Sequence, residues 1–266
     1  MAAVIAVGQA ADHQVQPAGE SRMSPADRTL LDGALAAYEH GESSKAEPVL
    51  SDLVKRYPAR FEIVETLGLI YAERGELSRA VHLLEEACRT NSAPAPAWAN
   101  LGVAYVRLNR NDETVRALDR AATLDPKNSQ TQSSLGQALM LTNQPQKAAK
   151  AFAAAHDGQP EDPDILYNWG LAVYESGDAR KAASILARIP ARSLSVQAHS
   201  LLGDVEEQLG HIDVALAHYR DAARADPSEG NLDALGLELL KHWSFDGAAR
   251  VYEYGVSRYP SSARCK

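Results

Sequence analysis

Cysteine is scarce in this chain, which has two cysteines, Cys88 and Cys265, among 266 residues. Neither lies in a CxxC pair, so the sequence suggests neither a disulfide framework nor a zinc site. Cys88 falls within a helical pattern of apolar residues, and we interpret it as a small buried side chain.

Positive charge and long apolar runs are also in short supply. There are 27 Lys and Arg residues against 35 Asp and Glu residues, a formal charge of −8. The chain therefore lacks the basic field that attracts nucleic acid or an anionic membrane. No apolar run reaches the roughly 18 residues that span a bilayer. We predict neither a nucleic-acid partner nor a membrane span.

Sequence motifs for catalysis are missing as well. The chain contains no HExxH, GxxxxGK[ST] or GxSxG pattern, and these motifs carry metal, phosphate and nucleophile chemistry. His211 and His218 lie seven residues apart and could share a helix face. No cysteine or third ligand is near them in the sequence, so we interpret both as solvated surface side chains. The sequence predicts no catalytic residue, no metal and no cofactor, and it indicates that the chain is not an enzyme.

What the chain does have is an internal repeat of 34 or 33 residues. A glycine column recurs at this spacing, at Gly68, Gly102, Gly136, Gly170, Gly203 and Gly236. A second column, mostly alanine, is Ala46, Ala80, Thr114, Ala148, Ala182, Ala215 and Ala248. A third is Gly41, Gly75, Asn109, Asn143, Gly177, Gly210 and Trp243. A fourth is Pro58, Ser92, Pro126, Pro160, Leu194, Pro227 and Pro260. Four columns in one phase indicate a single structural unit repeated seven times.

Each column has a physical cause in a pair of helices. Trp98, Leu101, Gly102 and Tyr105 are offset by 3, 4 and 7 residues, so they share one helix face. The Gly and Ala columns predict small residues where two helices cross closely. The Gly/Asn column predicts a left-handed cap after the first helix, and the Pro column predicts the end of the second.

The pattern resembles the tetratricopeptide repeat family. In the third repeat, its W-x2-L-G-x2-Y motif is matched by Trp98, Leu101, Gly102 and Tyr105. Later positions of the repeat pattern are matched by Leu118, Ala121 and Pro126, and Thr114 stands in place of the expected alanine. The resemblance implies an all-α, right-handed superhelical solenoid of about seven helix-turn-helix repeats, over residues 24–262. We place the repeats at 27–60, 61–94, 95–128, 129–162, 163–195, 196–228 and 229–262.

Both ends of the chain carry separate predictions. Residues 1–23 are predicted to be a disordered segment or a signal-peptide remnant, because a short apolar stretch precedes the small residues Gly8 and Ala10. Ser24 and Pro25 are predicted to begin the first helix. Residues 263–266 are predicted to be the truncated start of a further repeat, because no polar cap follows the seventh, and we expect a fragment of a longer protein. The cytoplasm is favoured, or the periplasm or exterior if a signal peptide was present.

The resemblance also implies a function, because partners of this family lie on the concave surface lined by the first helix of each repeat. The exposed positions there are expected to be 2, 5, 9, 12 and 13 of a repeat, which include Leu31 and Ala72. The residues predicted to contact a partner are Glu65, Leu69, Val103, Val106, Arg107, Gln137, Met140, Tyr167, Leu171, Tyr174 and Asp204. Some of the apolar ones could instead pack against a neighbouring repeat.

Charge at these positions predicts the chemistry of the partner. Acidic residues outnumber basic ones by nine to three, and no lysine stands at position 5. The clamp with which chaperone-binding members hold a C-terminal carboxylate is therefore rejected. We expect a protein or peptide ligand with apolar anchors and basic flanks. Two alternatives are a docking region of a larger enzyme or envelope assembly factor, and a module that self-associates through uncapped repeat ends.

Overall fold

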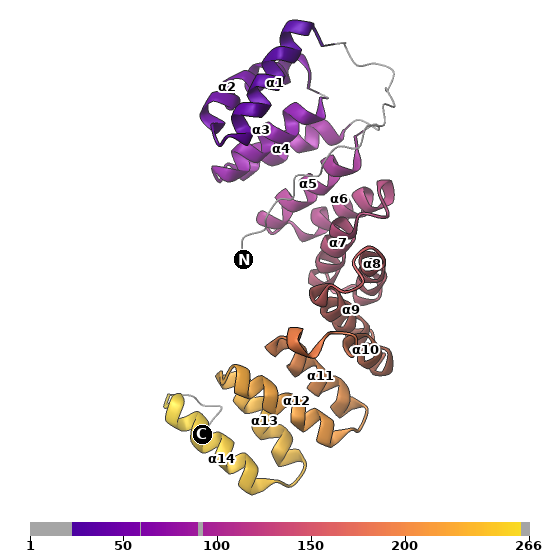
Figure 1. The fold of residues 1–266 in the computed structure, drawn as a ribbon, viewed down its shortest axis with the longest axis vertical. Helices are drawn as coiled ribbons and strands as arrows, with labels where there is room; N and C mark the ends of the chain where they lie inside the picture. Colours follow the sequence, from indigo (N-terminus) through magenta and orange to yellow (C-terminus); the bar gives the residue numbers. More distant parts are fainter. Residues whose placement is uncertain (1–22, 59, 90–92, 262–266) are drawn as a thin grey trace. The chain divides into compact units, whose positions relative to one another are not determined.

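The computed structural model describes residues 23–58, 60–89 and 93–261, and over these ranges the chain is helical with no strand (Figure 1). The first seven helices are α1 Pro25–Glu39, α2 Ser43–Arg56, α3 Phe61–Glu73, α4 Leu77–Cys88, α5 Ala95–Arg107, α6 Asn111–Leu124 and α7 Ser129–Leu141. The others are α8 Pro145–Gly158, α9 Pro163–Glu175, α10 Ala179–Leu186, α11 Val196–Gln208, α12 Ile212–Ala225, α13 Glu229–Lys241 and α14 Phe245–Arg258, with a 3-10 turn η1 Ala191–Ser193. The predicted all-α repeat fold is confirmed.

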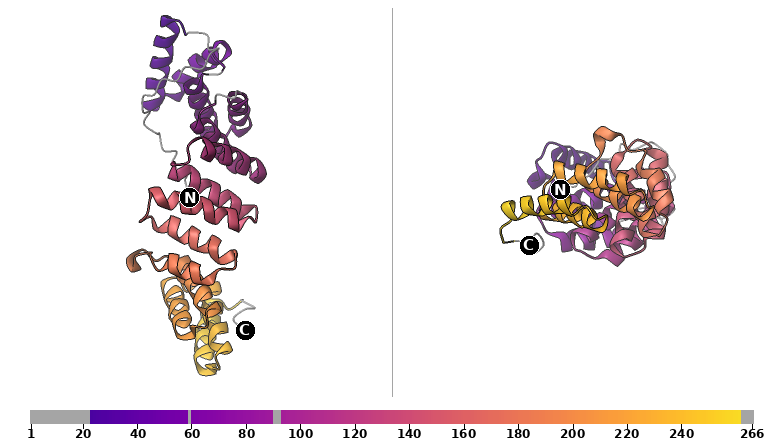
Figure 2. Two further views of the ribbon diagram at one scale, coloured as in Figure 1. Left: turned by 90° about the vertical axis from the view of Figure 1, so that its right-hand side faces the viewer. Right: turned by 90° about the horizontal axis from the view of Figure 1, so that it is seen from below.

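The helices form two compact bodies, residues 1–100 and residues 101–266. In the N-terminal body, α1 to α4 pack in chain order, and α1 also touches α3. In the C-terminal body, helices from α6 to α14 pack in chain order, and α9 touches both α7 and α11. Figure 2 shows α7 to α10 as successive layers. The first helices of consecutive repeats therefore lie side by side at α1 and α3, at α7 and α9, and at α9 and α11.

The two predicted end segments fall largely outside the described residues. Of 1–23 only Met23 is described, and it packs partly buried against the first core cluster. Residues 263–266 are not described. The start of the first helix is as expected, because the Ser24 hydroxyl accepts the Asp27 N–H at 3.1 Å and Pro25 is the first helical residue.

The glycine column marks the closest helix crossings. A Cβ atom added at Gly136 would lie 2.7 Å from the Phe152 ring, and one at Gly170 would lie 2.5 Å from the Leu186 side chain. At Gly68 the nearest atom, of Leu84, is 3.6 Å away, which is ordinary contact. The alanine column is buried between the same helices, and Thr114 fits there because its hydroxyl donates to the Arg110 carbonyl at 3.0 Å.

The Gly/Asn column adopts the left-handed conformation that the sequence predicts. Values of φ are 76° at Gly41, 77° at Gly75, 56° at Asn109 and Asn143, 93° at Gly177 and 80° at Gly210. Each of these residues follows the first helix of its repeat and turns the chain into the second.

Cys88 is buried as expected, and burial raises the pKa of its thiol to about 12.

Trp243 occupies the same left-handed position with φ of 60°, and 80% of its surface is exposed. Its ring meets Phe245 edge-on, with the centroids 5.9 Å apart. A residue with a Cβ pays about 1–2 kcal/mol in this conformation, and glycine does not. The substitution Trp243→Gly removes this backbone strain but also loses the contact between the Trp243 and Phe245 rings. We therefore expect it to raise the free energy of unfolding by about 0.5–1 kcal/mol.

Urea denaturation of Trp243→Gly beside Trp243→Ala measures this gain. Alanine keeps the Cβ atom and should give no stabilisation. Equal midpoints for the two variants would show that backbone strain at this position is not the cause.

Candidate functional site

In the N-terminal body, the predicted groove residues Glu65 and Leu69 lie on one stripe of α3 that also carries Glu73. Glu65, Leu69 and Glu73 follow one another at intervals of four residues, which places them on the same helix face. Asn100 of α5 donates its side-chain N–H to Glu65 Oε1 at 2.8 Å, and Tyr38 of α1 donates its hydroxyl to Glu73 Oε1 at 2.7 Å. Side-chain hydrogen bonds thus join α1, α3 and α5 along this stripe.

Burial changes the acid–base behaviour of the same stripe. It raises the pKa of Glu65, with the nearby Glu62 carboxylate adding to the shift and the Asn100 hydrogen bond opposing it. It also raises the pKa of Tyr38, whose hydroxyl is bound to Glu73. These groups are therefore partly withdrawn from water before any partner arrives.

In the C-terminal body, Tyr167, Leu171 and Tyr174 make a second stripe on α9. Burial raises the pKa of both tyrosines, and the charge of Asp204 on α11 adds to each shift. The Tyr219 hydroxyl donates to Asp204 Oδ1 at 2.7 Å and holds the carboxylate in this place. Three predicted residues of α9 and one of α11 are brought together here.

The other predicted residues are more scattered. Val106 is 46% exposed and Arg107 and Gln137 are exposed, whereas Val103 and Met140 are half-buried. Met140 packs against the core cluster around Phe152. The α9 stripe likewise packs against the cluster of Leu166 and Leu186. These apolar side chains of α7 and α9 therefore pack against the core on one side and remain partly exposed on the other.

Two positions of the sequence-based groove are wrong. Leu31 is only 6% exposed and Ala72 only 9%. Both belong to the hydrophobic core cluster that α1, α2 and α3 form. They are buried because neighbouring helices close over them, which position within a repeat does not reveal.

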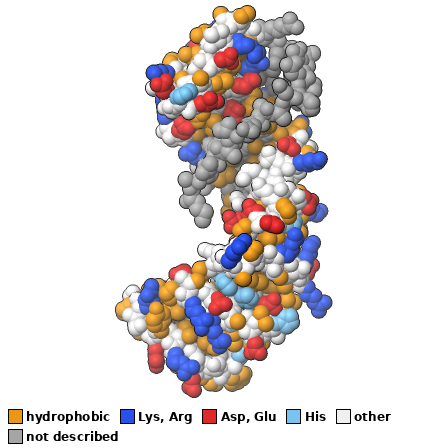
Figure 3. All heavy atoms as spheres, viewed as in Figure 1, with side chains coloured by type: hydrophobic (Ala, Val, Ile, Leu, Met, Phe, Trp, Pro, Cys, Tyr) orange, Lys and Arg blue, Asp and Glu red, His pale blue; other side chains and the backbone are white. Residues whose placement is uncertain are grey.

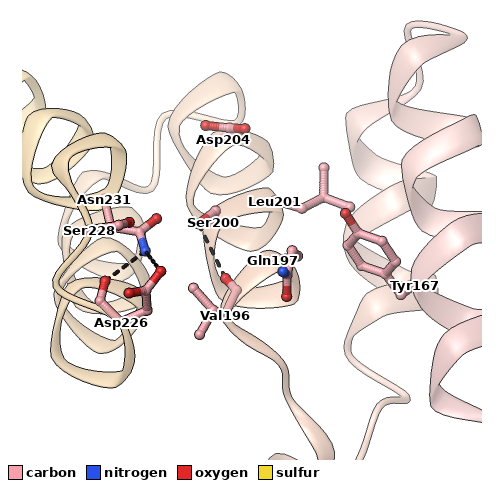
Figure 4. Close-up of a pocket in the computed structure, with 9 residues that line it drawn as sticks. All are labelled: Tyr167, Val196, Gln197, Ser200, Leu201, Asp204, Asp226, Ser228 and Asn231. Carbon is pink, nitrogen blue, oxygen red and sulfur yellow. Dashed lines mark hydrogen bonds between the residues drawn. The ribbon is translucent and has the colours of Figure 1, made fainter. Parts of the chain in front are cut away.

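An open hollow of about 300 Å³ lies beside the α9 stripe (Figure 4). Its walls come from α9, α11, the loop before α13 and the first turn of α13, namely Tyr167, Val196, Gln197, Ser200, Leu201, Asp204, Asp226, Ser228 and Asn231. Asn231 donates to the carbonyl of Asp226 at 2.7 Å and to its carboxylate at 3.2 Å. The sequence reading missed the loop residues, because it considered helix positions alone. Their place between the second helix of one repeat, α12, and the first helix of the next, α13, was the available signal.

The carboxylates of these two stripes have neutral hydrogen-bond donors. Glu65 is held by Asn100, Glu73 by Tyr38 and Asp204 by Tyr219. A neutral donor orients a carboxylate without cancelling its charge, so both stripes keep negative charge beside apolar groups. On the face shown in Figure 3, acidic, basic and apolar side chains are otherwise interspersed over the described parts of each body.

Known repeat proteins resemble this chain in sequence and in fold. Tetratricopeptide repeat sequence profiles match residues 31–96, 66–129, 99–164, 139–205 and 196–229. The chain belongs to the tetratricopeptide repeat family. The residue ranges that match this family contain the glycine crossings and left-handed turns from Gly41 to Gly210 described above. No curated protein matches the chain.

Solved tetratricopeptide repeat structures share the fold at low sequence identity. The C-terminal part of a repeat protein from Cytophaga hutchinsonii is 12% identical, with a TM-score of 0.69, over 88% of this chain and 97% of that one. PilW, a type IV pilus biogenesis factor, is 17% identical, with a TM-score of 0.61, over 76% and 95%. YrrB, a TPR protein with an unusual peptide-binding site, is 19% identical, with a TM-score of 0.54, over 60% and 82%.

No group of three or more His, Cys, Asp or Glu side chains converges as metal ligands within the described ranges. None of the described helices is long and apolar enough to cross a bilayer.

Proposed function

We propose that this tetratricopeptide repeat chain is a non-catalytic scaffold that binds protein or peptide segments along its first helices. The observation that carries the proposal is the pairing of apolar stripes with carboxylates that neutral donors hold in place. Preformed, half-buried surfaces of this kind lose little freedom when a ligand binds. That YrrB has a peptide-binding site on the same fold supports this role.

The same stripes suggest the chemistry of the ligand. Leu69 in one body, and Tyr167, Leu171 and Tyr174 in the other, would receive apolar anchors of an extended or helical segment. Glu65, Glu73 and Asp204 would pair with Lys or Arg residues that flank those anchors. Val103, Val106, Gln137 and Met140 are proposed to extend the apolar contact, with Arg107 as a nearby base.

Placing charge on the stripes tests the proposal. We expect Leu69→Glu combined with Leu171→Glu to abolish capture of the partner from extracts of the source organism, because each glutamate places a charge where an anchor must be buried. Each single variant should weaken capture and show which body holds the anchor. Mass spectrometry of the captured proteins reads the result.

A matched control carries the same chemical change away from the stripes. Leu124 is 42% exposed on α6 and Val214 is 45% exposed on α12, both second helices. Leu124→Glu combined with Val214→Glu should leave capture intact. Circular dichroism must show unchanged helicity in all variants. Capture that survives the groove changes would remove these stripes from consideration.

A specific observation favours self-association as a second function. Leu237, Leu240, Trp243 and Phe245 are exposed by 48%, 39%, 80% and 57% on the last described helix pair. A second copy could cover this apolar surface.

A further inference from the structure

A buried histidine lies at the junction of the fourth and fifth repeats. His156, in the last turn of α8, is 7% exposed. Its Nε2 atom lies 2.6 Å from Nη2 of Arg188, the second residue after α10. Its ring packs against Trp169 of α9, with the centroids 5.2 Å apart and the planes at 34°. One side chain thus joins α8, α9 and the turn that follows α10.

The bond to Arg188 requires a neutral imidazole ring. An arginine side chain has five N–H donors and no acceptor, so Nε2 of His156 must be the acceptor and can carry no proton. The single proton of the neutral ring is then on Nδ1. Nδ1 is buried and has no hydrogen-bond partner among the described residues. The fold therefore keeps one form of the ring, although that form leaves a buried donor unsatisfied.

The charges around His156 act in opposite directions. Burial and the Arg188 cation lower the pKa of His156, and the Asp157 carboxylate on the same helix opposes them. The end of α8 also favours a cation, because the helix dipole is negative there. From α9 the ring meets the uncharged Trp169. The lowering effects prevail, so the ring is neutral at pH 7.

We propose that His156 is an acid-sensitive switch between the fourth and fifth repeats. A proton taken from solvent by Nε2 removes the lone pair that accepts from Arg188 and brings two cations together. Arg188 is exposed and can turn into water, but the buried ring can be hydrated only if α8 and α9 part. Acid therefore loosens this junction. The loosened helix α9 also carries the stripe of Tyr167, Leu171 and Tyr174.

Three other histidines of the C-terminal body make contacts that tolerate a proton. His199 of α11 and His218 of α12 are half-buried and share a hydrogen bond between their Nδ1 atoms at 3.1 Å. The interpretation of His218 as a solvated side chain is therefore wrong. One ring of this pair can be protonated and still donate to the other. His211 is exposed, and its Nδ1 atom lies 2.6 Å from Glu206 Oε2, a contact that protonation preserves.

Comparison of the parent chain with His156→Gln across the pH range tests the proposal. Glutamine does not titrate, and its side-chain oxygen can accept from Arg188. Because the pKa is lowered in the folded state, the stability present above the ordinary value of about 6.5 is lost as the pH falls toward the lowered value. We expect the unfolding equilibrium constant of the parent, relative to His156→Gln, to rise by up to about tenfold per pH unit over this range.

His82→Gln is the matched control, because it makes the same change at an exposed histidine of α4. Its pH curve should run parallel to that of the parent. Parallel curves for the parent and His156→Gln would overturn the proposal.

A second measurement does not depend on the folding of variants. In the parent, the imidazole resonances of His156 should titrate below the ordinary pKa of histidine, and acid should speed hydrogen exchange first in α8, α9 and α10. Arg188→Met should move the His156 titration to higher pH, because it removes a cation from beside the ring. Titration of His156 at or above the ordinary pKa would overturn the proposal, as would acid-induced exchange confined to other helices.

Discussion

Gly136→Ala is expected to destabilise the chain by about 2 kcal/mol, whereas Gly68→Ala should be neutral or stabilise it by up to about 1 kcal/mol. Both substitutions add one methyl group to the same position of two repeats. The structure separates them by what the methyl meets. At Gly136 three atoms of the Phe152 ring lie within 2.8 Å of the added Cβ, and at Gly68 the closest atom is at 3.6 Å.

The opposite signs follow from two competing effects. Replacing glycine by alanine inside a helix gains about 1 kcal/mol because the unfolded chain loses freedom. Phe152 is fully buried and its ring cannot move away without displacing its neighbours, so overpacking costs about 1–3 kcal/mol and outweighs the gain. At Gly68 no close atom opposes the gain in helix stability, because the added methyl group makes only ordinary contact with Leu84.

Urea denaturation followed by circular dichroism measures both variants, and hydrogen exchange locates the loss in α7 and α8. Phe152→Ala supplies the second arm of a double-mutant cycle. In that background Gly136→Ala should no longer destabilise, because the overlapping ring is gone. Equal effects of Gly136→Ala with and without Phe152 would contradict the crossing as the cause.

Lys241→Met is expected to lower the free energy of unfolding by about 1–3 kcal/mol, because it removes a cation from beside a buried carboxylate. The Glu238 side chain is 1% exposed, and Lys241 Nζ lies 3.2 Å from its Oε2. The same ammonium group lies 2.5 Å from Glu207 of α11. His242 also contacts Glu238, at 3.0 Å, and Lys241 is itself half exposed, so the cost stays below that of a fully buried pair.

Two comparisons isolate this contribution. Lys45→Met removes an exposed partner of Glu42 and should leave the denaturation midpoint close to that of the parent. Lys241→Met combined with Glu238→Leu removes the buried charge together with its partner and should recover most of the loss. Denaturation midpoints of the three variants, taken side by side, give the answer. A double variant as unstable as Lys241→Met would contradict the buried-charge explanation.

The pH dependence of the Lys241→Met effect has a definite sign. The Lys241 hydrogen bond lowers the pKa of Glu207, so its stabilisation is complete above the ordinary pKa of glutamate and is lost as the pH falls through the lowered value. The contact raises the pKa of Lys241, so that contribution disappears only at strongly alkaline pH. The loss of stability caused by Lys241→Met should therefore be largest near neutrality and shrink as the pH falls below the ordinary pKa of glutamate.

The repeat fold was predictable because its signals are local and recur in one phase. A glycine at a helix crossing and a glycine or asparagine in a left-handed turn meet the same constraint in every repeat, so their spacing shows in the sequence. Even exceptions obey the constraint, since Trp243 takes φ of 60° where the column changes residue type. The placement of Glu65 and Leu69 on one face of α3 was predictable for the same reason, and their role in binding a partner stays a prediction.

The contacts that give these surfaces their character were not predictable. Glu65 meets Asn100 across 35 residues of chain, Tyr219 meets Asp204 across 15, and His199 meets His218 across 19. Such pairs differ from repeat to repeat and leave no periodic pattern. Their hydrogen bonds form only once the helices have docked, and so does the hollow beside α9.

The sequence by itself determined the helix pairs, their turns and the faces that pack, because these depend on residue size and backbone freedom at fixed spacing. Only the tertiary structure decided which carboxylates have neutral donors, that Leu31 and Ala72 are buried, and that His218 faces His199 rather than solvent. The physical reason is that charge pairing and burial depend on distances between side chains of different helices, which the repeat spacing does not determine.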